Sequence, residues 1–193
     1  DATWSWASID EGPAIATKTD GTLWTWGSNS DGYLGLNNDV TYSSPIQIGS
    51  GTDWATGSNK IGSTKAIKTD GTLWSWGPNE RGNLGIPSIP TAQAGNRSSP
   101  IQIPGTTWNT VSCRGGVYTL ATKTDGTLWG WGSNTYEKIG DSSQTQRSSP
   151  VQIPGTTWSY VEVGFRSSGG TKTDGTLWTW GWGNVGQLGI NSR

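Results

Sequence analysis

The chain of 193 residues contains no histidine and no methionine, and its only cysteine is Cys113. Without histidine, the Ser-His-Asp and Cys-His catalytic arrangements are excluded, and so is a metal cluster built from cysteine and histidine. A lone cysteine also excludes a disulfide within the chain. Because no catalytic pair can be named, we predict that the protein is not an enzyme and uses no cofactor.

Charged residues are few and evenly balanced. The chain has 13 basic and 14 acidic side chains and a formal net charge of −1, and neither sign forms a run. Recognition of a phosphate backbone needs clustered Lys and Arg, so we predict no nucleic-acid partner. No segment approaches 18 consecutive apolar residues, and we therefore predict no membrane insertion.

Glycine and tryptophan are abundant, with 30 and 14 copies, and they belong to a repeat. The heptapeptide Lys-Thr-Asp-Gly-Thr-Leu-Trp begins at Lys18, Lys68, Lys123 and Lys172, at spacings of 50, 55 and 49 residues. A period of this length, built from short strands and tight turns, is typical of a β-propeller with one unit per blade. We predict one all-β repeat domain over residues 1–193, with units at approximately 4–53, 54–107, 108–157 and 158–193.

Each heptapeptide predicts a β-hairpin, because Asp-Gly joins two β-favouring runs and glycine tolerates the positive φ of the turn. We interpret the repeated Asp as a turn residue and expect the repeated Lys to lie in solvent at a strand end. A second Trp follows the first by two positions, so both rings lie on one face of the sheet. We interpret the eight paired tryptophans as core; they are Trp24, Trp26, Trp74, Trp76, Trp129, Trp131, Trp178 and Trp180.

The last strand of a unit is predicted by Ser-Ser-Pro-(Ile/Val)-Gln-Ile, which begins at Ser43, Ser98 and Ser148. The fourth unit stops before this motif. Three whole units and one incomplete unit predict propeller-type blades in an arc that is either open or closed by another chain. The first residue is Asp rather than Met, so we expect that a leader was removed or that the chain is an excised piece.

These phrases resemble a known repeat. Ala-Ile-Lys-Thr-Asp-Gly-Thr-Leu-Trp-Ser-Trp-Gly and Asn-x-x-Gly-x-Leu-Gly are similar to the repeat of the regulator of chromosome condensation family, over nearly the full chain. The resemblance implies a propeller, usually of seven blades in that family. Its members include an exchange factor for a nuclear GTPase, inhibitors or adaptors, and repeats of bacterial and viral surface proteins. The family commonly has a His five positions before the hairpin Lys, and here Pro13, Ser63, Tyr118 and Ser167 stand there.

Positions where the four units differ are the candidates for partner contact, because repeat proteins concentrate variation in their binding loops. Trp182 stands where other units have Ser or Pro, and either an exposed contact or plain packing explains it. Tyr136 and Glu137 replace a turn that has Gly in other units. An extended loop from Pro87 to Asn96 accounts for most of the longest spacing.

We therefore predict a non-enzymatic binding or structural module that uses its loops for protein–protein interaction, self-association or adhesion. The Ser-, Thr- and Gly-rich composition favours a secreted, cell-surface or virion structure. One alternative is a carbohydrate-binding propeller lectin, in which each blade offers a shallow aromatic site to a glycan. Another is an intracellular GTPase-exchange or adaptor factor.

Overall fold

A computed structural model describes residues 2–9, 12–60, 63–91, 95–114 and 117–190. The described residues form four antiparallel sheets, each from strands that are consecutive in the chain. We call these sheets blades 1 to 4. None of the helices among the described residues is long and apolar enough to cross a membrane.

Three blades have four strands, and the fourth has three. Blade 1 contains β1 (Trp4–Ile9), β2 (Pro13–Lys18), β3 (Leu23–Gly27) and β4 (Tyr42–Gln47). Blade 2 contains β5 (Trp54–Lys60), β6 (Ser63–Lys68), β7 (Leu73–Gly77) and β8 (Arg97–Gln102). Blade 3 contains β9 (Trp108–Arg114), β10 (Tyr118–Lys123), β11 (Leu128–Gly132) and β12 (Arg147–Ile153), with the 3-10 turn η2 (Thr135–Glu137) before β12. Blade 4 contains β13 (Trp158–Val163), β14 (Ser167–Lys172) and β15 (Leu177–Gly181).

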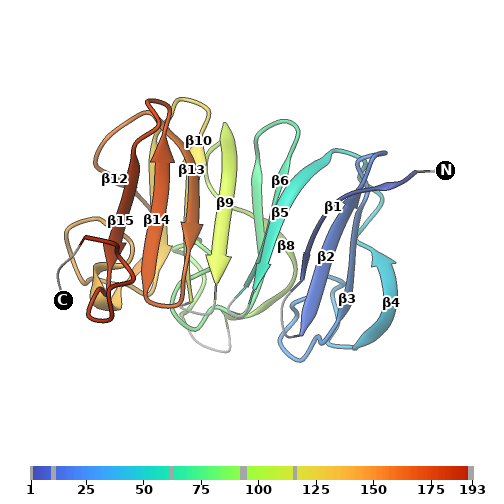
Figure 1. The fold of residues 1–193 in the computed structure, drawn as a ribbon. Helices are drawn as coiled ribbons and strands as arrows, with labels where there is room; N and C mark the ends of the chain where they lie inside the picture. Colours follow the sequence, from blue (N-terminus) through green and yellow to red (C-terminus); the bar gives the residue numbers. More distant parts are fainter. Residues whose placement is uncertain (1, 10–11, 61–62, 92–94, 115–116, 191–193) are drawn as a thin grey trace.

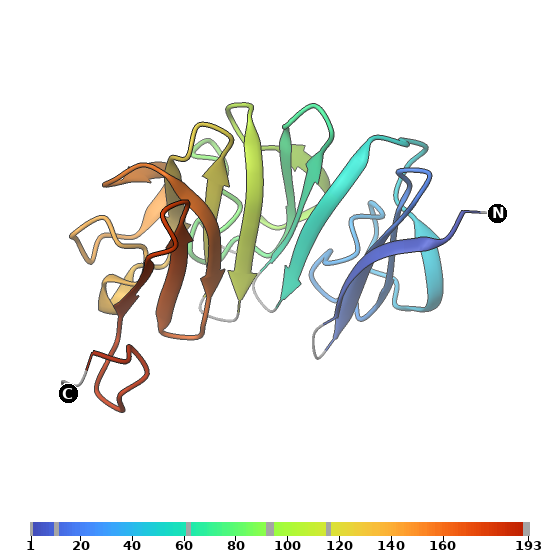
Figure 2. The same cartoon turned by 45° about the horizontal axis from the view of Figure 1, so that its top comes forward.

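The blades stand side by side in an arc, with the two chain ends at opposite sides (Figures 1 and 2). The first strands of consecutive blades contact one another, β1 with β5, β5 with β9 and β9 with β13, so these strands line the inside of the arc. The predicted all-β propeller fold, with four units of which the fourth lacks its last strand, is confirmed. The arc of the described chain is open.

The hairpin turn forms as predicted and is held by a relay of hydrogen bonds. In blade 2, the backbone N–H and the hydroxyl of Thr72 both donate to Asp70 Oδ1, at 2.9 and 2.7 Å. The indole N–H of Trp74 then donates to Thr72 Oγ1 at 3.0 Å. The other three blades repeat this relay, which identifies the recurrent aspartates as turn residues.

Each repeated lysine ends the second strand of its blade, as expected, but the expectation that its side chain lies in solvent was wrong. The ammonium of Lys123 lies 4.8 Å from the ring centre of Trp108 and 4.5 Å from that of Trp129. The lysines of the other blades lie over the equivalent ring pairs. A cation over an aromatic face is attracted by the ring quadrupole, so each lysine covers the outer edge of its Trp cluster.

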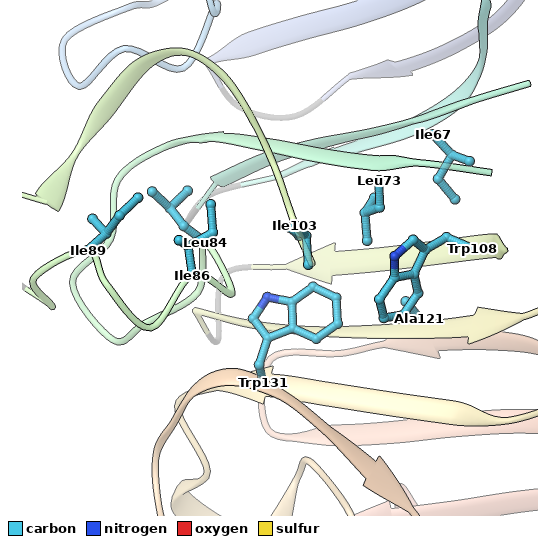
Figure 3. Close-up of a cluster of buried hydrophobic side chains, with 9 residues drawn as sticks. All are labelled: Ile67, Leu73, Leu84, Ile86, Ile89, Ile103, Trp108, Ala121 and Trp131. Carbon is cyan, nitrogen blue, oxygen red and sulfur yellow. The ribbon is translucent and has the colours of Figure 1, made fainter. Parts of the chain in front are cut away.

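The core lies between blades rather than within one sheet. Figure 3 shows Leu73, Leu84 and Ile103 of blade 2 facing Trp108 and Trp131 of blade 3. Trp131 is fully buried, as is Trp76 at the preceding junction, and both agree with the predicted core. In blades 2 and 3 the first Trp of the pair, Trp74 or Trp129, is only half-buried, because it lies at the edge beneath the lysine. Trp24, Trp26 and Trp180 are also half-buried. Trp178 is exposed, so the prediction that all eight tryptophans are core was wrong for this residue.

Candidate functional site

Arg166 lies among three aromatic side chains on the loops of blades 3 and 4. Its guanidinium carbon is 4.8 Å from the ring centre of Trp182 and 5.5 Å from those of Tyr136 and Phe165. The rings of Tyr136 and Trp182 have centres 6.1 Å apart and are tilted by 47°. We call these four residues the aromatic–arginine patch.

Three separate loops bring the patch together. Tyr136 belongs to η2 after β11, Phe165 and Arg166 form the turn between β13 and β14, and Trp182 directly follows β15. The backbone N–H of Trp182 donates to the carbonyl oxygen of Arg166 at 3.0 Å, which ties two of these loops together. Phe165 and Tyr136 are 61% and 41% exposed, whereas Arg166 and Trp182 are half-buried. The patch is therefore organised within the chain and open to solvent.

The backbone under the patch is strained. Tyr136 and Glu137 have φ of 68° and 58°, in the left-handed region that favours glycine. The other units have Gly32, Gly82 and Gly186 at the Glu137 position, all with positive φ. A non-glycine residue held there costs on the order of 1–3 kcal/mol, and such strain is concentrated at functional sites. In the third unit this strained backbone holds the ring of Tyr136 next to Trp182.

Lys138, next to Glu137 in the chain, is influenced by two other cations. Burial lowers the pKa of Lys138 to about 8, and the nearby charges of Arg81 and Arg166 act in the same direction. Among the described residues, no carboxylate forms an ion pair with Arg166. Beside Arg166 and Trp182, a hollow of about 320 Å³ extends to Val185. The site thus combines exposed aromatic surface with the guanidinium of Arg166.

The predicted contact residues fall into two groups. Tyr136 and Trp182 come together in the patch, so the ring of Trp182 is both packed and accessible. Glu137 is exposed at its border, where its carboxylate accepts a hydrogen bond from Gln144 at 3.4 Å.

The loop of the second unit lies elsewhere. Pro87 is exposed in the turn that Ile89 N closes onto Ile86 O at 3.1 Å. Asn96 accepts a hydrogen bond from Asn79 N at 3.1 Å and donates one to Asp31 of blade 1 at 3.2 Å. Asn96 therefore supports the loop and the junction of blades 1 and 2. Residues 92–94 of this loop lie outside the described residues.

Sequence reasoning missed Phe165 and the central role of Arg166. A signal was present, because Phe165 is the only phenylalanine of the chain and lies next to an arginine in a turn. The repeat does not show that the turn between β13 and β14 contacts η2 and the segment after β15. In the described part of the chain, no three His, Cys, Asp or Glu residues are grouped so that they could hold a metal ion.

Four-stranded antiparallel blades, joined so that each packs its Trp cluster on the blade before it, define a β-propeller repeat protein. Residues 20–58, 70–121 and 125–168 match the regulator of chromosome condensation (RCC1) repeat. These segments make up well over half of the chain, and the protein belongs to this family.

Solved propellers share the fold. The structure of human WBSCR16 superposes with a TM-score of 0.85 at 20% identity, over 100% of this chain and 51% of that one. Prp20p from Saccharomyces cerevisiae, solved in a study of its binding to Gsp1p and histones, gives a TM-score of 0.84 at 17% identity, over 100% and 48%. The yeast protein in complex with Kap60 gives 0.82 at 17%, over 100% and 47%. The chain therefore spans about half the length of these structures. No curated protein matches it in sequence.

Proposed function

We propose that the protein is a protein-binding module and that the aromatic–arginine patch is its contact with a partner. The observation that carries this proposal is the grouping of Arg166 with three aromatic rings on an organised surface. Trp, Tyr and Arg are enriched among the few residues that dominate the binding energy of protein interfaces. Here the rings and the guanidinium are already held in place before any partner binds.

The charge around the patch favours an acidic partner segment. The positive charges of Arg81 and Arg166 lie close enough to Lys138 to help lower its pKa, after the larger effect of burial. A carboxylate docked beside Arg166 would form a charge-assisted hydrogen bond and relieve this repulsion. We therefore infer a partner that presents Asp or Glu next to an apolar side chain able to enter the hollow near Val185.

Structural relatives support a protein partner in general terms. Prp20p was studied for its binding to Gsp1p and histones, and it was solved bound to Kap60. Their identity to this chain is below 25%, so the likeness concerns the fold, and their partners do not transfer by it. Adhesion, an extracellular location, glycan binding, nucleotide exchange and the absence of enzymatic activity stay predictions from the sequence.

A peptide array tests the proposal. Peptides that combine Asp or Glu with Leu, Phe or Trp are the probes, with Lys-containing versions of the same peptides for comparison. We expect acidic peptides to bind and salt to weaken the binding. Tyr136→Ala and Arg166→Ala should each weaken it about tenfold or more.

Tyr160→Ala is the matched control, because Tyr160 is exposed like Tyr136 but lies on β13 outside the patch. It should bind like the wild type. Equal binding of acidic and basic peptides, or equal binding by the Tyr136→Ala and Tyr160→Ala proteins, would contradict the proposed site.

A further inference from the structure

The junction between blades 2 and 3 encloses a lysine side chain. Lys65, on β6, is completely buried, and its Nζ donates a hydrogen bond to Ser63 Oγ at 2.5 Å. An ammonium has three N–H donors, so this bond uses only one of them. Among the described residues, no carboxylate forms an ion pair with Lys65. The structure thus holds a cation inside a core without an anionic side chain to balance it.

Two buried hydroxyl groups belong to the same junction. Ser75 of β7 and Thr119 of β10 are completely buried. Neither Ser75 Oγ nor Thr119 Oγ1 has a hydrogen-bond partner within the described chain. Buried polar groups in proteins are nearly always hydrogen-bonded, so two such hydroxyls beside a buried ammonium indicate a missing acceptor.

Strand register places Lys65 and Ser75 on the face of blade 2 that meets blade 3. The two residues lie directly opposite each other in the β6–β7 pair, so their side chains share one face of the sheet. Ile67 and Leu73, each two positions along its strand, lie on that face and pack in one cluster with Trp131 of blade 3.

Thr119 lies on the opposing face of blade 3. It pairs with Cys113 on one side and with Trp131 on the other, and Cys113 Sγ donates to the backbone carbonyl of Ser63 at 3.4 Å. Burial lowers the pKa of Lys65 to about 8, and Cys113 is near enough to act in the opposite direction. An ammonium, a thiol and two hydroxyls therefore lie on facing sheets at one junction.

The lysine is a departure from the repeat. The equivalent position, three residues before the Lys that begins each heptapeptide, is Ile15 in blade 1 and Leu120 in blade 3, and both are completely buried. Gly169 stands there in blade 4. A blade thus accepts an apolar residue or glycine at this position and does not need an ammonium for its own packing.

The hydroxyls differ from their counterparts in the same way. At the position of Ser75, Thr25 of blade 1 donates to a backbone carbonyl at 3.0 Å. At the position of Thr119, Thr64 and Ser168 donate to carbonyls of the preceding blade at 2.9 and 2.7 Å. Both buried hydroxyls that lack a partner in the described chain therefore lie at the junction that contains Lys65.

Charge decides what would satisfy these groups. At neutral pH the Lys65 ammonium is protonated, and burying an unpaired charge costs far more than burying a hydroxyl. A water molecule could accept one of its N–H groups but would leave the charge unbalanced. Ammonium, hydroxyl and thiol groups can all donate to a single acceptor. A monatomic anion supplies both the negative charge and the acceptor, and it needs little space.

We propose that the junction between blades 2 and 3 binds a chloride ion, with Lys65 as its ion-pair partner and the hydroxyls of Ser75 and Thr119 as further donors. Bound chloride would join the two sheets and stabilise the folded chain. The site lies inside the arc, apart from the aromatic–arginine patch, and its proposal does not depend on the proposed partner contact.

Urea unfolding in chloride and in gluconate, at pH 6.5 and the same ionic strength, tests the proposal. We expect 100 mM chloride to raise the folding equilibrium constant about tenfold, as a dissociation constant of about 10 mM implies. Lys65→Met should not respond to the exchange of anions. In gluconate the ammonium lacks its counterion, so Lys65→Met should be more stable than the wild type there.

Three further variants sharpen the measurement. Ser75→Ala and Thr119→Val keep the ammonium and lose one donor each, so each should weaken chloride binding about threefold to tenfold. Lys172→Met is the matched control, because it removes a half-buried lysine that lies over two Trp rings of blade 4. It should respond to chloride like the wild type.

Bromide provides a direct readout, because its anomalous scattering marks its position in a crystal. Crystals grown with bromide in place of chloride should show one peak within hydrogen-bond reach of Lys65 Nζ, and crystals of Lys65→Met should show none there.

Either of two results would overturn the proposal. One is an equal response of the wild type and Lys65→Met to the exchange of anions, including no response in either up to about 500 mM chloride. The other is a bromide crystal without a peak at Lys65, which would assign the junction to water or to a Cys113 thiolate. Tyr136→Ala should keep the chloride response, so failure of the partner-binding proposal and failure of this one are distinguishable.

Discussion

The indole nitrogen of Trp131 donates a 3.0 Å hydrogen bond to the backbone carbonyl of Asn83, and this contact joins the core of blade 3 to the loop of blade 2. Both groups are buried, so neither can exchange this partner for water. Trp131, which belongs to the repeated hairpin of blade 3, therefore also stabilises the junction between blades 2 and 3. The stability of the arc depends on these boundaries.

Replacing Trp131 with Phe should destabilise the protein by about 2–4 kcal/mol, because the carbonyl of Asn83 loses its donor and a cavity opens beside Leu84. Trp26→Phe is the matched control. Trp26 is the same residue of the repeat, but in the described structure its indole does not enter the loop of another blade, so its change in this chain should cost less than about 1 kcal/mol. Urea denaturation of both variants gives the comparison, and equal losses would contradict the role of the junction.

Gly85 and Gly189 form a second matched pair. Both have positive φ, 77° and 67°, so replacement by alanine introduces a similar backbone strain at either site. At Gly85 the added Cβ would also lie 2.7 Å from Trp131 Nε1, whereas at Gly189 it meets nothing within 4 Å. We expect Gly85→Ala to lose about 1–3 kcal/mol more than Gly189→Ala. Thermal or urea unfolding of the protein measures the difference, and its absence would mean that the packing around Trp131 adapts freely.

Lys65 makes stability depend on pH. Burial lowers the pKa of Lys65 to about 8, while its Nζ donates to Ser63 Oγ at 2.5 Å. The unfolded chain keeps the ordinary value near 10.5, so between about pH 8 and 10.5 it binds more protons than the folded chain, and stability rises with pH. Below pH 8 the charged ammonium is buried at a cost on the order of 3 kcal/mol.

Lys65→Met removes this cost. At pH 7 the variant should be more stable than the wild type, and the gap should shrink as the pH approaches 10. Urea unfolding of both proteins at several pH values measures the difference in their free energies of unfolding. The effects of other groups that titrate in this range are common to both proteins and cancel in the difference. A gap that stays constant with pH would show that Lys65 does not change protonation in the folded protein.

The hairpin turns contribute to the acid sensitivity of the fold. Hydrogen bonds from the backbone N–H and the hydroxyl of Thr72 lower the pKa of Asp70 below its ordinary value. The stabilisation that the Asp70 carboxylate gives to the folded state is therefore complete above the unfolded pKa near 4. It is lost as the pH falls through the lower pKa of the folded state. Asp70→Asn should be less stable than the wild type at pH 6, with the difference fading towards pH 2. Asp39→Asn, at an exposed aspartate outside the turns, is the control and should show a smaller effect at pH 6.

Much of the fold could be predicted because the repeat encodes local structure. The Asp-Gly pair of each heptapeptide determines a turn, and the alternation around Trp74 and Trp76 determines a strand, since both depend on neighbours close in sequence. The missing last strand of blade 4 followed from the absent Ser-Ser-Pro motif. Two predicted contact residues, Tyr136 and Trp182, were found because they depart from the repeat. The place of Lys123 over two Trp rings was not predicted, since a turn motif does not show what packs above it.

The sequence by itself determined the number of units, the strands of each unit and the hairpin that begins them, because these depend on backbone preferences and side-chain alternation within about 50 residues. Only the tertiary structure decided which surfaces meet. It places Phe165 and Arg166 beside Tyr136 and Trp182, and it leaves Leu177 and Trp4 uncovered at opposite ends of the arc. Those relationships depend on how one blade packs on the next, and packing joins residues that no local pattern connects.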